Sequence, residues 1–344
     1  MHNFFRTTAL ALCSSFVLVA ASLPAGAAEA APARVTFDGQ IRNNSLALSP
    51  DESTAVVSYS ERPDLIVYDL VTGAVRGVLR GYVTPRNIVF APDGKSFYVS
   101  DSSLGTVTRL DTATLKPLAT ASTLAAGPGA FGTALSKDGS SLYVNNQASS
   151  TVTRLDIASG QAKVVITGFA QPRQGVRLSP DGTKLYVTNF LGDKVTIVDT
   201  QTDKIEGEIT GFNKIRAISV TADGKTLFAA NSGSNDIAVV DIGARRVTGT
   251  VPVGRDPYGA ALTPDGRFVY SGNLADNTVS VIDVATLKVV ATIAGFKQPR
   301  QAIVFTRDGK TAYVLNEDLS ISKVERAGQR IVATLAAPQA VAAY

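Results

Sequence analysis

The chain has 344 residues and a formal net charge of +4, with 33 Lys and Arg against 29 Asp and Glu. It contains one Cys, one His, one Met and no Trp. A single Cys excludes an intrachain disulfide, and the absence of any run of like charges argues against a nucleic-acid-binding arm. A chain of this length can bury a core that is large enough to fold without disulfides.

The first residues have the layout of a secretory signal peptide. Arg6 precedes an apolar run at 7–23, and Pro and small residues follow. The run contains three Ser residues and is shorter than the roughly 20 apolar residues that a membrane span needs. Cys13 lacks the preceding small residue of a lipoprotein acylation site. We therefore expect cleavage after Ala27, a short linker at 28–33, no membrane span afterwards, and release into the bacterial periplasm or outside the cell.

Cleavage at this point removes the only His, Cys and Met, and the loss of Arg6 lowers the net charge from +4 to +3. Without His or Cys the remaining chain cannot form a Ser-His triad, a Cys nucleophile, or an imidazole or thiolate site for a metal or haem. The sequence predicts no metal, no cofactor and no catalytic residue of these common kinds.

A short turn sequence repeats along the rest of the chain. It is complete at 179–182, where the residues are Ser-Pro-Asp-Gly, and its aspartate recurs at intervals of 42 to 45 residues. The seven positions are Asp51, Asp93, Asp138, Asp181, Asp223, Asp265 and Asp308. The same period accounts for two nearly identical heptapeptides, GFAQPRQ at 168–174 and GFKQPRQ at 295–301, which lie three repeats apart. A period in this range indicates a repeat architecture.

Each unit contains four short strand patterns, which in the fourth unit fall at 175–178, 184–188, 194–198 and 204–209. Asp-Gly between the first two predicts a tight hairpin turn, because Gly adopts positive φ without a steric clash. Seven such units predict an all-β fold, a seven-bladed β-propeller of four-stranded antiparallel blades. We expect one domain over residues 34–344 and a monomer.

The second strand pattern of the fourth unit reads Tyr-Val-Thr-Asn at 186–189, and weaker versions occur at 97–101, 142–146, 228–231 and 313–316. In these words the chain resembles the YVTN-type β-propeller repeat family, over roughly residues 34–335. The resemblance implies an exported or surface-associated seven-bladed propeller and specifies no catalytic residue. The first unit departs from the pattern at Glu52 and Tyr59, and the seventh departs from it at Glu325.

When the seven units are aligned on the turn aspartate, each aligned position gives a column of seven residues. Some columns have the residue types that the fold requires, and others contain candidate site residues. Asn or Asp stands eight positions after the aspartate in units 2 to 7, and we expect these side chains to close strand ends. Small residues stand six positions before it, as expected for crowded innermost strands, and apolar residues five and three positions before it are expected to pack between blades. The aromatic residues that follow Gly in the connecting loops are expected to be packing plugs; they are Tyr82, Phe169, Phe212 and Phe296.

The column seven positions before the aspartate is different, because its residues are large and mostly polar. It reads Asn44, Arg86, Phe131, Gln174, Arg216, Tyr258 and Gln301, with Arg42, Arg173 and Arg300 beside it. In a propeller this column lies at the mouth of the central channel, where arginine suits carboxylate or phosphate. The predicted ligand-binding residues are Arg86, Arg173, Gln174, Arg216, Tyr258, Arg300 and Gln301. The alternative is that these arginines bond channel carbonyls or pair with acidic loop residues such as Asp101, Asp193 or Glu317.

Three functions remain open at this stage. The first is an exported, non-catalytic binding scaffold for an unknown anionic small molecule or protein partner. The second is a lactonase-type or sugar-acid hydrolase that works with carboxylates and arginines alone, for which Glu61 is the one isolated carboxylate candidate. The third is single-stranded nucleic-acid binding, which a net charge of +3 without a basic stripe disfavours.

The last sequence-based prediction concerns ring closure. Arg34-Val35-Thr36-Phe37 resembles Arg246-Val247-Thr248-Gly249, which starts an outermost strand. We therefore expect residues 34–37 to pair with the outer edge of blade 7 and to cover an exposed strand edge.

Overall fold

A computed structural model describes residues 33–35, 42–118 and 123–339. They belong to one compact unit, Ala33–Tyr344. The predicted signal peptide and residues 28–32 of the linker lie outside the described residues. In the described part of the chain, no helix has the length and apolar character to cross a bilayer.

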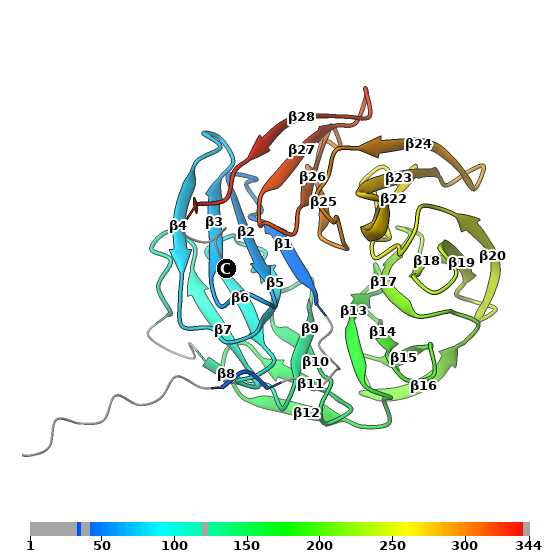
Figure 1. The fold of residues 1–344 in the computed structure, drawn as a ribbon. Coiled ribbons are helices and arrows are strands. Elements are labelled where there is room, and N and C mark those ends of the chain that lie inside the picture. The colour runs from blue at the N-terminus through cyan, green and yellow to red at the C-terminus, as the bar shows by residue number, and fades with distance from the viewer. Residues whose placement is uncertain (1–32, 36–41, 119–122, 340–344) are drawn as a thin grey trace, which may run out of the picture. The chain divides into compact units, whose positions relative to one another are not determined.

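The described residues form 28 strands in seven four-stranded antiparallel sheets, each built from four consecutive strands (Figure 1). This confirms the seven-bladed propeller. The innermost strands are β1 (Asn44–Leu48), β5 (Pro85–Phe90), β9 (Ala130–Leu135), β13 (Pro172–Leu178), β17 (Ile215–Val220), β21 (Ala261–Leu262) and β25 (Ile303–Phe305). The second strands are β2 (Thr54–Tyr59), β6 (Ser96–Asp101), β10 (Ser141–Asn146), β14 (Lys184–Asn189), β18 (Thr226–Asn231), β22 (Phe268–Asn273) and β26 (Thr311–Leu315).

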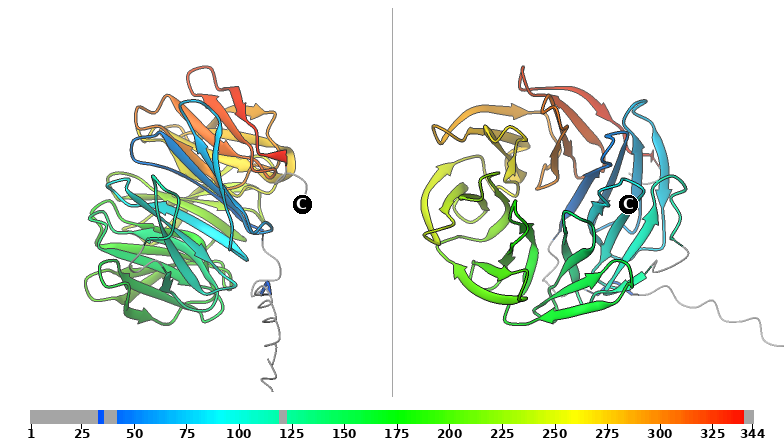
Figure 2. Two further views of the ribbon diagram at one scale, coloured as in Figure 1. Left: turned by 90° about the vertical axis from the view of Figure 1, so that its left-hand side faces the viewer. Right: turned by 180° about the vertical axis from the view of Figure 1, so that it is seen from behind.

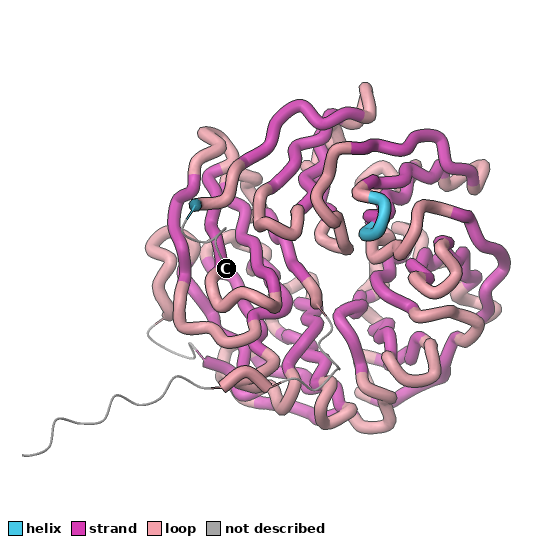
Figure 3. Tube along the Cα trace, viewed as in Figure 1, coloured by secondary structure: helices cyan, strands magenta, loops and turns pink. Residues whose placement is uncertain are grey.

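The outer half of each blade completes the sheet. The third strands are β3 (Leu65–Asp69), β7 (Thr106–Asp111), β11 (Thr151–Asp156), β15 (Val195–Asp199), β19 (Asp236–Asp241), β23 (Thr278–Asp283) and β27 (Ile321–Glu325). The outermost strands are β4 (Val75–Leu79), β8 (Thr123–Ala125), β12 (Ala162–Ile166), β16 (Lys204–Ile209), β20 (Arg246–Pro252), β24 (Lys288–Ala294) and β28 (Arg330–Leu335). The 3-10 helix η1 (Leu274–Asp276) lies between β22 and β23 and is drawn in cyan in Figure 3. Figure 2 shows the same sheets from the side and from behind.

The hairpin between the first two strands has the predicted chemistry. Ser179 Oγ donates to Asp181 Oδ1 at 2.5 Å, the Thr183 amide donates to the same oxygen at 3.1 Å, and Gly182 has φ 75°. The Lys184 amide in turn donates to Ser179 Oγ at 2.9 Å. Because each side chain satisfies a turn amide, the turn is fixed locally and recurs wherever its sequence recurs.

The Asn column is structural, as expected. Asn189 Oδ1 accepts from the Ala170 amide at 2.8 Å, and Asn189 Nδ2 donates to Thr196 Oγ1 at 2.9 Å. Asn316 makes the equivalent bond to the Lys297 amide at 2.9 Å. Each of these buried side chains therefore ties the preceding interblade loop to the end of a second strand.

Seven hydrophobic clusters among the described residues correspond to the seven interfaces between neighbouring blades. The predicted interblade columns enter them; Ile88 and Phe90, for example, pack between blades 1 and 2. The loop aromatics Tyr82, Phe169 and Phe296 are buried in three of the clusters, which confirms their role as packing plugs.

The column of small residues is required, although the physical reason differs from the expected crowding at the axis. A Cβ on Gly175 would lie 2.6 Å from Thr188 Cγ2 and 2.8 Å from the Arg216 carbonyl oxygen of the next blade. A Cβ on Gly132 would lie 2.6 Å from the Gln174 carbonyl oxygen. The space is therefore taken by the backbone of the next innermost strand.

The predicted strand pairing of residues 34–37 with blade 7 is wrong for its described part. The sheet of blade 7 contains β25 to β28, and the described residues 33–35 add no strand to it. Arg34 instead pairs with Glu61, and the Val35 amide donates to Ser103 Oγ at 2.9 Å. Thr36 and Phe37 lie outside the described residues. Two residues of similar sequence do not fix a partner, because tertiary contacts decide pairing at a sheet edge.

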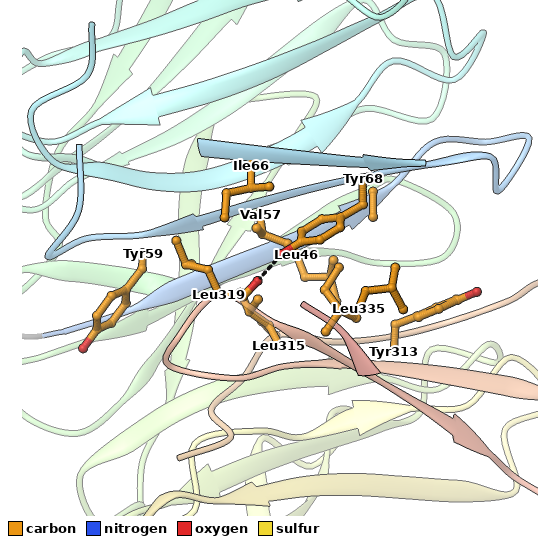
Figure 4. Packing of buried hydrophobic residues seen from close by; sticks show 12 residues of the cluster. Leu46, Val57, Tyr59, Ile66, Tyr68, Tyr313, Leu315, Leu319 and Leu335 are labelled. Carbon is orange, nitrogen blue, oxygen red and sulfur yellow. Dashed lines mark hydrogen bonds between the residues drawn. The ribbon is translucent and has the colours of Figure 1, made fainter. Parts of the chain in front are cut away.

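The ring closes by side-chain packing between blades 7 and 1, which we call the seam. Blade 1 contributes Leu46, Val57 and Tyr68 to this cluster, and blade 7 contributes Leu315 and Leu319 among others. Figure 4 shows these side chains facing one another, with a hydrogen bond of 2.7 Å from Tyr68 Oη to the Leu319 carbonyl oxygen.

Candidate functional site

A cavity of about 200 Å³ lies where the innermost strands begin, and we call it the mouth cavity. Its wall comes from several blades, since each innermost strand contributes the residues at its start. Of the predicted site residues, five line it: Arg173, Gln174, Arg216, Tyr258 and Gln301. Arg86 and Arg300, which are 1% and 4% exposed, are not among the lining residues, whereas Arg173 is one of them although it is also buried.

The glutamines of the two repeated heptapeptides meet in this cavity. Gln301 Nε2 donates to Gln174 Oε1 at 2.7 Å, although the two residues are 127 positions apart. Both side chains also donate to the carbonyl oxygen of Asn44, at 3.0 Å from Gln174 and 2.7 Å from Gln301. Asn43 Nδ2 donates to Gln174 Oε1 at 3.0 Å. Blades 1, 4 and 7 are thereby joined by one polar network across the channel.

The arginines of the heptapeptides reach backbone carbonyls of the next blade. Arg173 Nη1 donates to the Ile215 carbonyl oxygen at 3.4 Å, and Arg300 Nη1 donates to that of Arg42 at 3.3 Å. Arg173 and Arg300 therefore make the contacts that the alternative to ligand binding predicts, in which the arginines bond carbonyl groups in the channel. Arg173 both makes such a contact and lines the cavity.

Each predicted arginine also lies over an aromatic ring. The guanidinium of Arg173 is 4.3 Å from the ring centre of Phe190, and that of Arg86 is 4.3 Å from that of Phe131. Cation–π contacts of this kind hold a guanidinium plane in a fixed orientation. The Arg side chains at the mouth are therefore held in place before any ligand binds.

Tyr258 contacts two arginines, with its ring centre 4.5 Å from the Arg216 guanidinium and 5.0 Å from that of Arg300. Arg216 Nε also donates to Ser232 Oγ at 2.8 Å. Arg216 lines the cavity, and its two Nη groups are further hydrogen-bond donors that this bond does not use.

The charge of the cavity wall is positive. Four arginines line it, and no Asp or Glu is among the described residues that do so; the four are Arg42, Arg173, Arg177 and Arg216. Arg42 Nη1 is 3.7 Å from Glu317 Oε1, a carboxylate outside the lining. The cavity therefore concentrates guanidinium groups where an anion would be attracted.

Comparison with known proteins assigns the chain to a family. A family model described as "Lactonase, 7-bladed beta-propeller" matches residues 46–206 and 198–301. The chain belongs to this lactonase propeller family. Among solved structures, a chain of Kuenenia stuttgartiensis hydrazine synthase is 20% identical, with a TM-score of 0.74 over 82% of this chain and 95% of that one. At this identity the likeness shows the fold alone. The comparison with curated proteins found no match.

Glu61 and Glu317 are carboxylates that interact with the charge of Arg42 on the cavity wall of this lactonase-family propeller. Glu61, the candidate from the sequence, is ion-paired with Arg34; burial raises its pKa, but the hydrogen bond and charge of Arg34 outweigh this and hold the pKa below its usual value. Glu317 Oε1 accepts a hydrogen bond of 2.9 Å from Tyr59 Oη. Burial raises the pKa of Tyr59 to about 12, so this phenol remains a donor at neutral pH. No group of three or more potential metal ligands occurs in the described chain.

Arg177 is a lining residue of this lactonase-family propeller that the sequence analysis missed. It stands four positions before the turn aspartate. The column reads Ala47, Val89, Ala134, Arg177, Ser219, Ala261 and Val304. A single arginine among small and aliphatic residues is a detectable signal in the aligned repeats, and on a strand this position shares a face with the small column two residues earlier.

Proposed function

We propose that this protein is an exported binding protein whose mouth cavity takes a small anion that carries a carboxylate or phosphate group. The observation that carries the proposal is the cavity wall, which contains four arginines and, among the described lining residues, no carboxylate. Arginine presents a planar set of donors that matches both anionic groups. Arg42 is 3.7 Å from Glu317 outside the wall, so the charge offered to a ligand comes mainly from the other arginines.

The size and rigidity of the cavity favour a small ligand over a large one. Its volume of about 200 Å³ is below the roughly 300–1,000 Å³ of sites for drug-sized molecules. The stacked rings of Phe190 and Tyr258 hold Arg173 and Arg216 in place, so little side-chain entropy is lost on binding. An acidic segment of a partner protein is the alternative occupant.

The test uses thermal shift and calorimetry with inorganic phosphate and with mono- and dicarboxylates. Arg216→Gln removes one charge from the wall and keeps a hydrogen-bonding side chain. Arg246→Gln is the matched control, because Arg246 is exposed on the outermost strand β20. We expect binding that weakens as salt rises and is reduced at least about tenfold in Arg216→Gln. Equal affinities in the two variants would exclude the mouth cavity as the site.

Lactone hydrolysis is the second candidate function, and the family match supports it. Glu317, which pairs with Arg42 of the wall, is the carboxylate that we propose as a proton acceptor for this reaction. A pH-stat assay with sugar-acid lactones tests it. Turnover by the wild type that is lost in Glu317→Gln would favour the hydrolase over the binding protein, whereas rates equal to spontaneous hydrolysis would exclude it.

We also propose that the protein is exported and that it belongs to the YVTN-type propellers. The signal-like segment and the Tyr-Val-Thr-Asn words support an exported, YVTN-type propeller that acts as a monomer in the periplasm or outside the cell. Mass spectrometry of the protein recovered from periplasmic and extracellular fractions should give a mature N-terminus at residue 28. A full-length chain confined to the cytoplasm would contradict it.

A further inference from the structure

Arg177 occupies a position on β13 that no other blade fills with a charged residue. The register of the blade pairs Pro172 with Asn189 at the mouth and Arg177 with Tyr186 farther along. Gln174 and Arg177 are three positions apart on a strand with a register shift between Pro172 and Val176, so the two levels are at most about 10 Å apart. The mouth cavity thus has a second, inner level of positive charge.

The wall around this inner level is mostly aliphatic. Val89 and Val304, which occupy the same column in blades 2 and 7, line the cavity with Arg177. Small residues in the remaining blades leave space in the channel for a long side chain. Arg177 is accessible to solvent inside the channel, yet protein surrounds it, and this desolvation lowers its pKa. The guanidinium still remains charged, because its ordinary pKa is far above neutrality.

The contacts of Arg177 show no structural task for its charge. Its Nη1 donates to the carbonyl oxygen of the preceding residue, Val176, at 2.8 Å. No described carboxylate forms an ion pair with Arg177, and desolvation is the one influence on its pKa. Solvent in the channel reduces the cost of this charge without a counter-ion, but the Arg side chains on the same wall add like-charge repulsion.

From this placement we infer that Arg177 forms a second anionic subsite, so that the ligand is an extended dianion with one charged group at the mouth and one at the inner level. The inference rests on the proposed function, and specifies its ligand class. One group contacts Arg173 and Arg216 at the mouth, and the second contacts Arg177. The aliphatic wall at Val89 and Val304 suits the carbon skeleton between them.

The experiment is calorimetry with two matched series of ligands. Linear α,ω-dicarboxylates from malonate to azelate are compared with the monocarboxylates of equal carbon number. Arg177→Val gives blade 4 the residue that blades 2 and 7 have in this column. Arg246→Val on β20 is the control for the loss of one charge. Arg177→Gln is the second variant if Arg177→Val does not fold.

We expect one chain length to bind the wild type at least about tenfold more tightly than its monocarboxylate. This advantage should disappear in Arg177→Val, and it should persist in Arg246→Val. Dicarboxylate affinity that is unchanged in Arg177→Val overturns the inference while leaving the mouth site intact. If neither carboxylate series nor inorganic phosphate binds the wild type, the proposed function and the inference both fail.

Discussion

The aspartate of each hairpin turn shows how a single side chain sets both local structure and acid sensitivity. Asp138 accepts hydrogen bonds from Ser136 Oγ at 2.6 Å and from the Ser140 amide at 3.1 Å. The Ser136 bond is the largest cause that lowers the pKa of Asp138, from 3.8 to about 2. The ionised form is therefore favoured by the folded state.

Asp138→Asn tests the resulting pH dependence. A lowered folded-state pKa contributes stability that is complete above the unfolded value near 3.8 and is lost as pH falls through about 2. The variant keeps an acceptor oxygen but loses the charge, so it should be less stable than the wild type above pH 4, and the gap should close toward pH 2. Urea midpoints across this range measure the gap, and a gap that does not change with pH would refute the argument.

For Arg177 we predict that loss of the charge stabilises the fold, whereas loss of the Asp138 charge destabilises it. Removing one cation from a wall of like charges should stabilise the ligand-free fold. Because Arg177 is exposed to solvent, we expect Arg177→Val to raise the melting temperature by at most about 2 °C. The rise should shrink as salt increases. Arg246→Val corrects for the β-propensity of valine. A lower melting temperature in Arg177→Val than in this control would mean that Arg177 has a structural role.

Gly175 tests the packing of neighbouring innermost strands. Gly175→Ala places a Cβ 2.8 Å from the Arg216 carbonyl oxygen, so β13 and β17 must separate. We expect a loss of about 1–3 kcal/mol in the free energy of unfolding. Gly249→Ala on β20 is the matched control, since a Cβ there meets no atom within 4 Å. Chemical denaturation should leave the control unchanged or slightly stabilised; equal losses in both variants would contradict a steric cause.

The sequence predicted the elements well because their determinants are local. The turn at 179–182 and the strands beside it depend on residues within a few positions of one another, and the repeat supplies seven copies of each signal. The predicted pairing with blade 7 failed at Arg34 and Val35, because no local signal specifies which sheet edge a segment meets. Local patterning determines a blade, whereas the contacts of a terminal segment depend on the assembled ring.

The sequence predicted which column of residues surrounds the cavity, but it did not predict which members of that column line it. Arg86 and Arg216 occupy the same column, and each Nε donates to a Ser Oγ at 2.8 Å. Arg216 nevertheless lines the cavity, while Arg86 is almost completely buried and also donates to Asn43 Oδ1. Which arginine reaches the channel depends on neighbours from a different blade, and the sequence of one repeat does not contain that information.

At the scale of the whole ring, the seam between blades 7 and 1 is a test of closure by packing. Tyr68→Phe removes the bond to the Leu319 carbonyl oxygen and leaves this buried acceptor without its partner. We expect a loss of about 1–2 kcal/mol and faster amide hydrogen exchange in β3 and β27. Tyr270→Phe is the control, because it breaks a bond of similar length, 2.8 Å, to Gln329 outside the seam. Exchange rates that rise equally at both places would show that the seam is not a distinct point of opening.

Each blade consists of four consecutive strands, so no sheet is shared between the two ends of the described chain. The first and last blades therefore behave like two binding partners, held at a high effective concentration by the five blades between them. A circularly permuted chain that begins with blade 2 and ends with blade 1 would keep all seven interblade clusters and move only the position of the break. We therefore expect the same ring to form whichever blade is synthesised first.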